Sequence, residues 1–191
     1  MIKLFTSIKT TGTIPWKHGI TEIAILVEKN GKVIDQMYTK MNPGDVEFDQ
    51  KALTINNEKI EDIQKYIPQE FAFKHIEEIL NKHYSQNEKF MIVAYNAPFV
   101  YDFILNMFKR YGVTVNESGE QHNRFFDYFY SPALDVMQLA NIAMLDIRPT
   151  IPDFKFNTIC TAFDLPTPSD NSCFKTVRLL FMLYNKLSFS T

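Results

Sequence analysis

Ser7 and Lys9 lie two residues apart near the end of an apolar N-terminal segment, just before a Thr-Thr-Gly turn at 10–12. Alternating apolar residues followed by a short polar segment predict a first β-strand that runs into a tight turn. Residues two apart in a strand point to the same face, so the hydroxyl and the ammonium share one side. An ammonium repels divalent cations, so Lys9 is not expected to bind a metal. We expect it either to be exposed to solvent or to pair with a carboxylate across a cleft.

Two later segments carry further candidate positions. Residues 95–104, YNAPFVYDFI, follow a short apolar run, and Asn171 and Thr176 lie at the start of the final helical pattern. With the turn at 10–12, these segments resemble the DnaQ-like 3′-5′ exonucleases, the DEDDh branch of the ribonuclease-H-like superfamily. That family opens with Asp-x-Glu-Thr-Thr-Gly, continues with His/Tyr-Asn-Ala-x-Phe-Asp and ends with His-x-Ala-x-x-Asp.

Shorter segments extend the resemblance along the chain. Ile-Thr-Glu-Ile at 20–23, Asn-Pro-Gly at 42–44 and Asp-Val-Met-Gln-Leu-Ala at 135–140 are similar to family segments, and 52–56 is a partial match. Because the resemblance covers nearly the whole chain, it implies a single exonuclease-like domain, residues 1–191.

The resemblance also implies that the family's catalytic groups are missing. Family members hold two divalent cations about 4 Å apart with four carboxylates, and a histidine is the general base. Matching the motifs puts other residues at these five positions: Ser7, Lys9, Val100 and Thr176 for the carboxylates, and Asn171 for the histidine. We therefore predict vestigial positions with no catalytic residue, no metal and no cofactor, and a chain that is not an enzyme.

Two alternatives stay open. An active 3′-5′ exonuclease would need displaced acids, and the candidates are Asp102, Asp127, Asp135 and Asp170. Asp102 lies two residues beyond Val100, a step that turns a side chain by about 200° around a helix. The second alternative is an unrelated α/β domain with accidental motif likeness.

An aromatic cluster is the main candidate binding surface. Five rings fall within six residues: Phe125, Phe126, Tyr128, Phe129 and Tyr130. A loop with so many rings is not expected to be wholly buried, so we interpret it as a protein interface or a stacking platform for bases. The alternative is a flap that covers the core.

Charge and composition favour protein partners over nucleic acid. The net charge of −2 and the pI near 6.1 lack the basic excess of a nucleic-acid-binding protein. We expect a structural or adaptor protein in a larger assembly, for instance a phage virion or a replication complex. A non-cleaving single-stranded nucleic-acid-binding protein is the alternative. The expected location is the cytoplasm or a phage particle, and no apolar run is long enough to span a bilayer.

The apolar patterns and the resemblance together predict an α/β fold, a ribonuclease-H-like mixed five-stranded sheet in the order 3-2-1-4-5, flanked by helices. Strands are expected near 2–8, 20–28, 33–41 and 90–95, with a weak last strand near 113–115. An Asn-Gly pair at 30–31 predicts a hairpin between the second and third strands. Helices are expected at 60–67, 71–84, up to 111, at 134–145, 156–163 and near the C-terminus, with Cys160 and Cys173 as reduced core residues.

Overall fold

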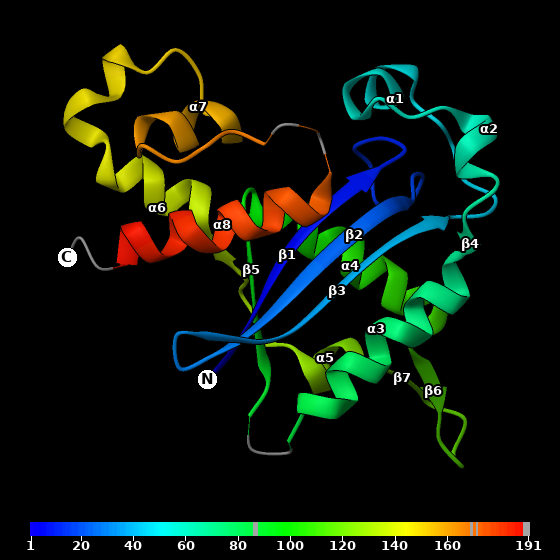
Figure 1. The fold of residues 1–191 in the computed structure, drawn as a ribbon. Helices are drawn as coiled ribbons and strands as arrows, with labels where there is room; N and C mark the ends of the chain where they lie inside the picture. The colour runs from blue at the N-terminus through cyan, green and yellow to red at the C-terminus, as the bar shows by residue number, and fades with distance from the viewer. Residues whose placement is uncertain (86–87, 169, 171, 189–191) are drawn as a thin grey trace.

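One mixed sheet separates two layers of helices (Figure 1). The computed structural model describes residues 1–85, 88–168, 170 and 172–188. Six strands form the sheet in the order β4-β3-β2-β1-β5-β8. Their bounds are Ile2–Thr10 (β1), Ile20–Lys29 (β2), Lys32–Asn42 (β3), Ile67–Pro68 (β4), Phe90–Ala94 (β5) and Leu134–Asp135 (β8).

β1 is the centre of the sheet. It pairs antiparallel with β2 on one side and parallel with β5 on the other. β2 turns back into β3 through Asn30 and Gly31, whose φ angles of 53° and 80° are the positive values that an Asn-Gly hairpin turn needs. The four main strands and the parallel pairing of β1 with β5 confirm the predicted architecture.

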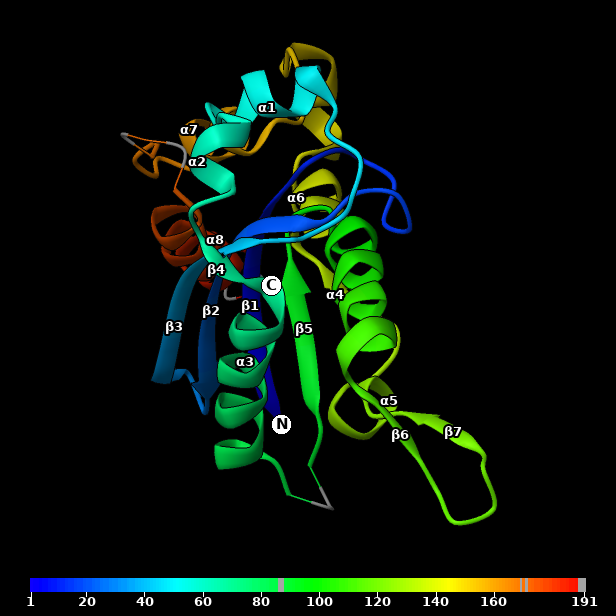
Figure 2. The same ribbon diagram turned by 90° about the vertical axis from the view of Figure 1, so that its right-hand side faces the viewer.

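The fifth strand was predicted at the wrong place. β8 pairs parallel with β5, and it occupies the first two residues of the segment expected to be helix at 134–145. The segment near 113–115 instead forms β6 (Val113–Val115), which pairs only with β7 (Gln121–Asn123) in a separate hairpin. Figure 2 shows this hairpin projecting beyond α4. Its residues are mostly exposed, so they lack the apolar surface that an inner sheet position would bury.

Helices cover both faces of the sheet. α3 (Gln69–His83) and α4 (Ala97–Tyr111) lie on one face, and α8 (Cys173–Ser188) crosses β1 and β2 on the other (Figures 1 and 2). The remaining helices are α1 (Gln50–Asn56), α2 (Ile60–Ile63), α5 (Phe125–Tyr128), α6 (Val136–Ala143), the 3-10 helix η1 (Leu145–Thr150) and α7 (Phe156–Ala162). The helices at 60–67 and 134–145 are therefore shorter than predicted.

Each face of the sheet has its own hydrophobic core. Alternate residues of β1 point to opposite faces, so Leu4 joins the core under α3 and α4, whereas Phe5 joins the core under α8. Cys160 and Cys173 are buried, free cysteines in the second core, as predicted. Among the described residues, no helix is long and apolar enough to cross a membrane.

Candidate functional site

A cleft opens at the carboxyl end of β1, on the side of α8. One hollow of about 320 Å³ is lined by ten residues: Ser7, Ile8, Lys9, Ile55, Asn56, Phe156, Asn157, Pro168, Cys173 and Thr176. A second hollow of about 200 Å³ shares Ser7, Phe156 and Thr176 and reaches Val100. The structure thus brings together four of the five predicted positions, Ser7, Lys9, Val100 and Thr176. Asn171 lies outside the described residues.

Lys9 forms an ion pair in this cleft. Its Nζ lies 3.0 Å from Oε2 of Glu22, its direct cross-strand neighbour on β2. The Glu22 side chain is fully buried, and that of Lys9 is 13% exposed. Of the two roles expected for Lys9, the structure shows pairing with a carboxylate, which comes from the adjacent strand.

Glu22 also holds the start of α8. Its Oε1 accepts a 2.7 Å hydrogen bond from the backbone N–H of Cys173, the first residue of that helix. The first amides of a helix have no partner within the helix and carry partial positive charge, so a carboxylate is favourable there. Glu22 therefore joins β1, β2 and α8 through one buried carboxylate.

Burial raises the pKa of three titratable groups near the cleft. Burial is the main reason that the pKa of Cys173 is raised, and the charge of Glu22 raises it further. Burial alone raises the pKa of Cys160 to about 11. It also raises the pKa of Glu58, whose carboxylate accepts a 2.7 Å hydrogen bond from Thr21. Neither cysteine is a thiolate at neutral pH, so neither is a nucleophile of the kind that low-pKa cysteines provide.

The side chains of the cleft do not fit a pair of divalent cations. Hard cations need clustered oxygen ligands, whereas Lys9 contributes an ammonium and Val100 a buried apolar side chain that is 4% exposed. Across the described part of the chain, no three His, Cys, Asp or Glu side chains form a group that could hold a metal.

The four displaced acids do not gather at the cleft. Asp135 caps α6 through its own hydrogen bond to the helix backbone, and Asp127 pairs with a histidine. Asp170 lines a neighbouring hollow with Lys9 and Glu22, where it pairs with a lysine at the start of α8. Asp102 lies on the exposed side of α4 and, with Asp135, lines a different hollow.

The aromatic cluster is largely core, which corrects its interpretation as a mostly exposed loop. Phe125, Tyr128 and Phe129 are at most 5% exposed, and all three rings pack against Phe108 of α4. Positions 125, 128 and 129 lie on one face because the segment forms the single helical turn α5. That spacing was the sequence signal for burial. Only two rings of the cluster remain outside: Phe126 is 51% and Tyr130 38% exposed.

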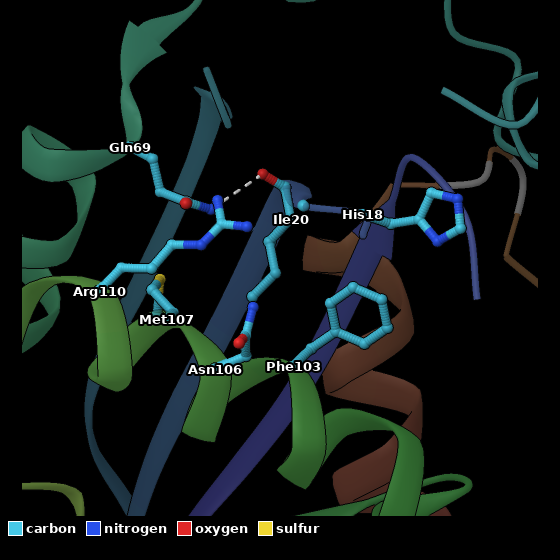
Figure 3. A pocket seen from close by; sticks show the side chains of 8 residues that line it. His18, Ile20, Gln69, Phe103, Asn106, Met107 and Arg110 are labelled. Carbon is cyan, nitrogen blue, oxygen red and sulfur yellow. Dashed lines mark hydrogen bonds between the residues drawn. The ribbon is translucent and has the colours of Figure 1, made fainter. Parts of the chain in front are cut away.

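A smaller hollow lies between α4 and the start of β2 (Figure 3). Its volume of about 10 Å³ is at the lower limit for one water molecule, so it cannot enclose a ligand. Arg110 reaches over it beside Gln69, whereas the His18 ring points away. Neither this arginine nor Glu22 was among the predicted site residues. A carboxylate within the 20–23 segment was the available signal for Glu22.

Comparison with known proteins supports the fold. The chain matches no protein-family model. It is 26% identical over 164 residues to the PolC-type DNA polymerase III of Halalkalibacterium halodurans, which covers 83% of this chain and 9% of the polymerase. E. coli exonuclease I in complex with a dT13 oligonucleotide superimposes with a TM-score of 0.76 at 14% identity, over 98% of this chain and 41% of exonuclease I. A 3′-exonuclease, from a structure of 3′-end-specific recognition of a histone mRNA stem-loop, superimposes with a TM-score of 0.69 at 8% identity. The match covers 97% of this chain and 63% of that exonuclease.

These matches confirm the resemblance at the level of fold: the chain has the ribonuclease-H-like fold of exonuclease I and related 3′-exonucleases. They contradict the prediction that the chain is not an enzyme, because the structural neighbours are exonucleases and the sequence relative is a polymerase. The prediction rested on five aligned positions, and substitutions there do not by themselves show inactivity. The chain spans less than two thirds of the length of each of these relatives.

Proposed function

We propose that this exonuclease-fold domain binds the end of a single-stranded nucleic acid in the cleft beside Ser7. The observation that carries the proposal is the lining of that cleft, which includes both aromatic rings and uncharged polar groups. Phe99 and Phe156 line it as partly buried rings, and such rings are platforms on which bases stack. The fold adds support, since exonuclease I with this fold was solved with dT13.

Uncharged amides supply the polar contacts in this proposal. Asn96 and Asn157 border the two hollows, and both side chains are exposed without a hydrogen-bond partner among the described residues. Amides can donate to and accept from bases and sugars. The Lys9 charge is balanced by Glu22, so the cleft is expected to attract the strand mainly by stacking and hydrogen bonding. Its binding should then depend on salt less steeply than binding by a row of lysines.

The test is binding of fluorescently labelled oligo-dT and oligo-rU, followed by anisotropy over a range of salt concentrations. We expect Phe156→Ala to weaken binding by about 1–3 kcal/mol, the usual effect of losing one stacked ring. Because the Phe156 ring also packs on Tyr95, Asn157→Ala on an exposed amide serves as the variant that leaves the core intact. Phe71→Ala, an exposed ring on α3, is the matched control.

Absence of binding, or equal binding by all of these variants, would overturn the proposal. The same mixtures, incubated with Mg²⁺ or Mn²⁺ and with a chelator, would be separated by length. Shortening of the strand from its 3′ end would show directly whether the bound nucleic acid is also a substrate.

A protein-binding role is the second candidate function. It rests on Phe126 and Tyr130, the two exposed rings of the aromatic segment. Aromatic rings provide large contact areas with few rotatable bonds, which suits the centre of a protein interface. This role concerns the end of the molecule that carries α5, opposite the carboxyl end of β1 (Figure 1). It is compatible with nucleic-acid binding at the other end.

A further inference from the structure

Trp16 is the sole tryptophan of the chain, and it is 74% exposed. It lies in the loop that joins β1 to β2, at the same end of the sheet as the cleft (Figure 1). A single exposed apolar residue is ordinary on a protein surface. The way in which this loop is held makes Trp16 unusual.

The loop is fixed on both sides of the ring. At its base, the N–H of Thr11 donates to the carbonyl of Gly19 at 2.9 Å. Within it, the N–H of His18 donates to the carbonyl of Ile14 at 2.8 Å, and the His18 ring accepts from the N–H of Ile14 at 2.9 Å. The backbone that carries Trp16 is therefore already ordered, so a partner would not have to order it on binding.

The loop is also tied to α4. The side-chain amide of Asn106 donates a hydrogen bond to the carbonyl of Pro15, the residue before Trp16. Arg110 follows Asn106 by four residues, so it lies on the same face of α4, about 6 Å further along the helix axis. The loop and α4 thus present an aromatic ring and a guanidinium on neighbouring elements.

The Arg110 side chain has no ion pair or hydrogen bond among the described residues. Its guanidinium is exposed above the small hollow that His18, Gly19 and Ile20 also line (Figure 3). Lys17, next to Trp16, adds a second exposed cation whose contact with Glu47 is 3.4 Å long. An exposed ion pair between a lysine and a carboxylate contributes little to stability, so Lys17 stays available to an anion.

We infer that Trp16 and Arg110 form a second contact for the single strand whose end lies in the cleft, with a base stacked on Trp16 and a phosphate held by Arg110. The inference rests on the proposed function and extends the strand beyond the cleft. A ring near the unpaired Arg110 side chain and the weakly paired Lys17 matches a nucleic acid, which offers a base and a phosphate in each nucleotide. A protein partner would need an acidic group beside an apolar one. The cleft at the same end of the sheet adds no argument for such a protein partner.

The sole tryptophan makes the test direct, because protein fluorescence reports on this one ring. Oligo-dT long enough to reach past the cleft should quench Trp16 fluorescence with the same dissociation constant that anisotropy measures. Trp16→Ala should weaken binding by about 5-fold or more, the lower end of the effect of one stacked base. Phe71→Ala, the exposed ring on α3 that also serves as the control for the cleft, should leave affinity unchanged.

Arg110→Gln tests the phosphate contact. It should weaken binding of all sequences alike and reduce the slope of affinity against salt concentration by about one unit, whereas Lys74→Gln on α3 should change neither. Binding without quenching of the Trp16 fluorescence, or unchanged affinity of Trp16→Ala, would overturn the inference. A protein partner would then be the better explanation for the exposed ring. If the wild-type protein binds no oligonucleotide at all, the proposed function itself fails, and this inference fails with it.

Discussion

Replacing Lys9 by methionine tests how the cleft is held together. Lys9→Met keeps most of the side-chain length but removes the ammonium, which leaves the fully buried Glu22 carboxylate without its cation. Removing one partner of a buried ion pair costs about 3–5 kcal/mol of folding free energy. Glu22 keeps its hydrogen bond from the N–H of Cys173, so we expect the lower end of this range, about 3 kcal/mol.

Urea and thermal unfolding would measure the loss. For a domain of this size each kcal/mol corresponds to roughly 2–4 °C, so Tm should fall by about 6–12 °C. Lys74→Met is the matched control: its pair with Glu70 has both side chains 57% exposed, and the expected loss is below about 1 kcal/mol. The double variant Lys9→Met with Glu22→Gln should recover much of the stability, because it leaves no unpaired charge. A Lys9→Met protein as stable as the control would refute the buried pair.

Asp35, the exposed rings and the cysteines give further measurable outcomes. Hydrogen bonds from a lysine and a histidine of α3 lower the pKa of Asp35 to about 2, so its stabilising effect, measured against Asp35→Asn, should be complete above the ordinary value of 3.8 and lost as the pH falls towards 2. Equal acid sensitivity of both proteins would contradict this. Phe126→Ala with Tyr130→Ala should weaken a protein assembly by about 2 kcal/mol, measured by sedimentation, with Tm almost unchanged; loss of folding would instead make the rings core. Cys160 and Cys173 should react with a thiol reagent only after unfolding, since burial raises both pKa values, and rapid labelling of the native protein would count against it.

The main strands were predictable because their signals are local. The Asn-Gly pair at 30–31 demands positive φ at two successive residues, and few structures other than a tight hairpin satisfy that demand. The continuous apolar run at 90–94 indicates a strand covered on both faces, and it lies parallel to β1. Such patterns can be recognised from neighbouring residues in the sequence alone.

The errors arose where long-range contacts decide the structure. β8 is two residues long, and its pairing with β5 depends on the position of α6, which the local sequence does not reveal. The rings of α5 were expected at the surface because of their number. Their helical spacing places Phe125 and Phe129 against Phe108, about twenty residues away in the sequence, and that contact decides their burial.

Lys9 shows how a motif can identify a position without its contacts. The resemblance singled out Lys9, which lines the cleft, but the choice between solvation and pairing depended on the register of β1 against β2. That register sets Lys9 directly opposite Glu22 and shifts immediately afterwards, between Lys9 and Thr10. A displacement by one residue would turn Glu22 to the other face of the sheet, away from both Lys9 and the first N–H of α8. The charge of Lys9 at the cleft is therefore balanced through the sheet pairing, and under the proposed function the same pairing leaves stacking and neutral hydrogen bonds as the main forces that would hold a strand there.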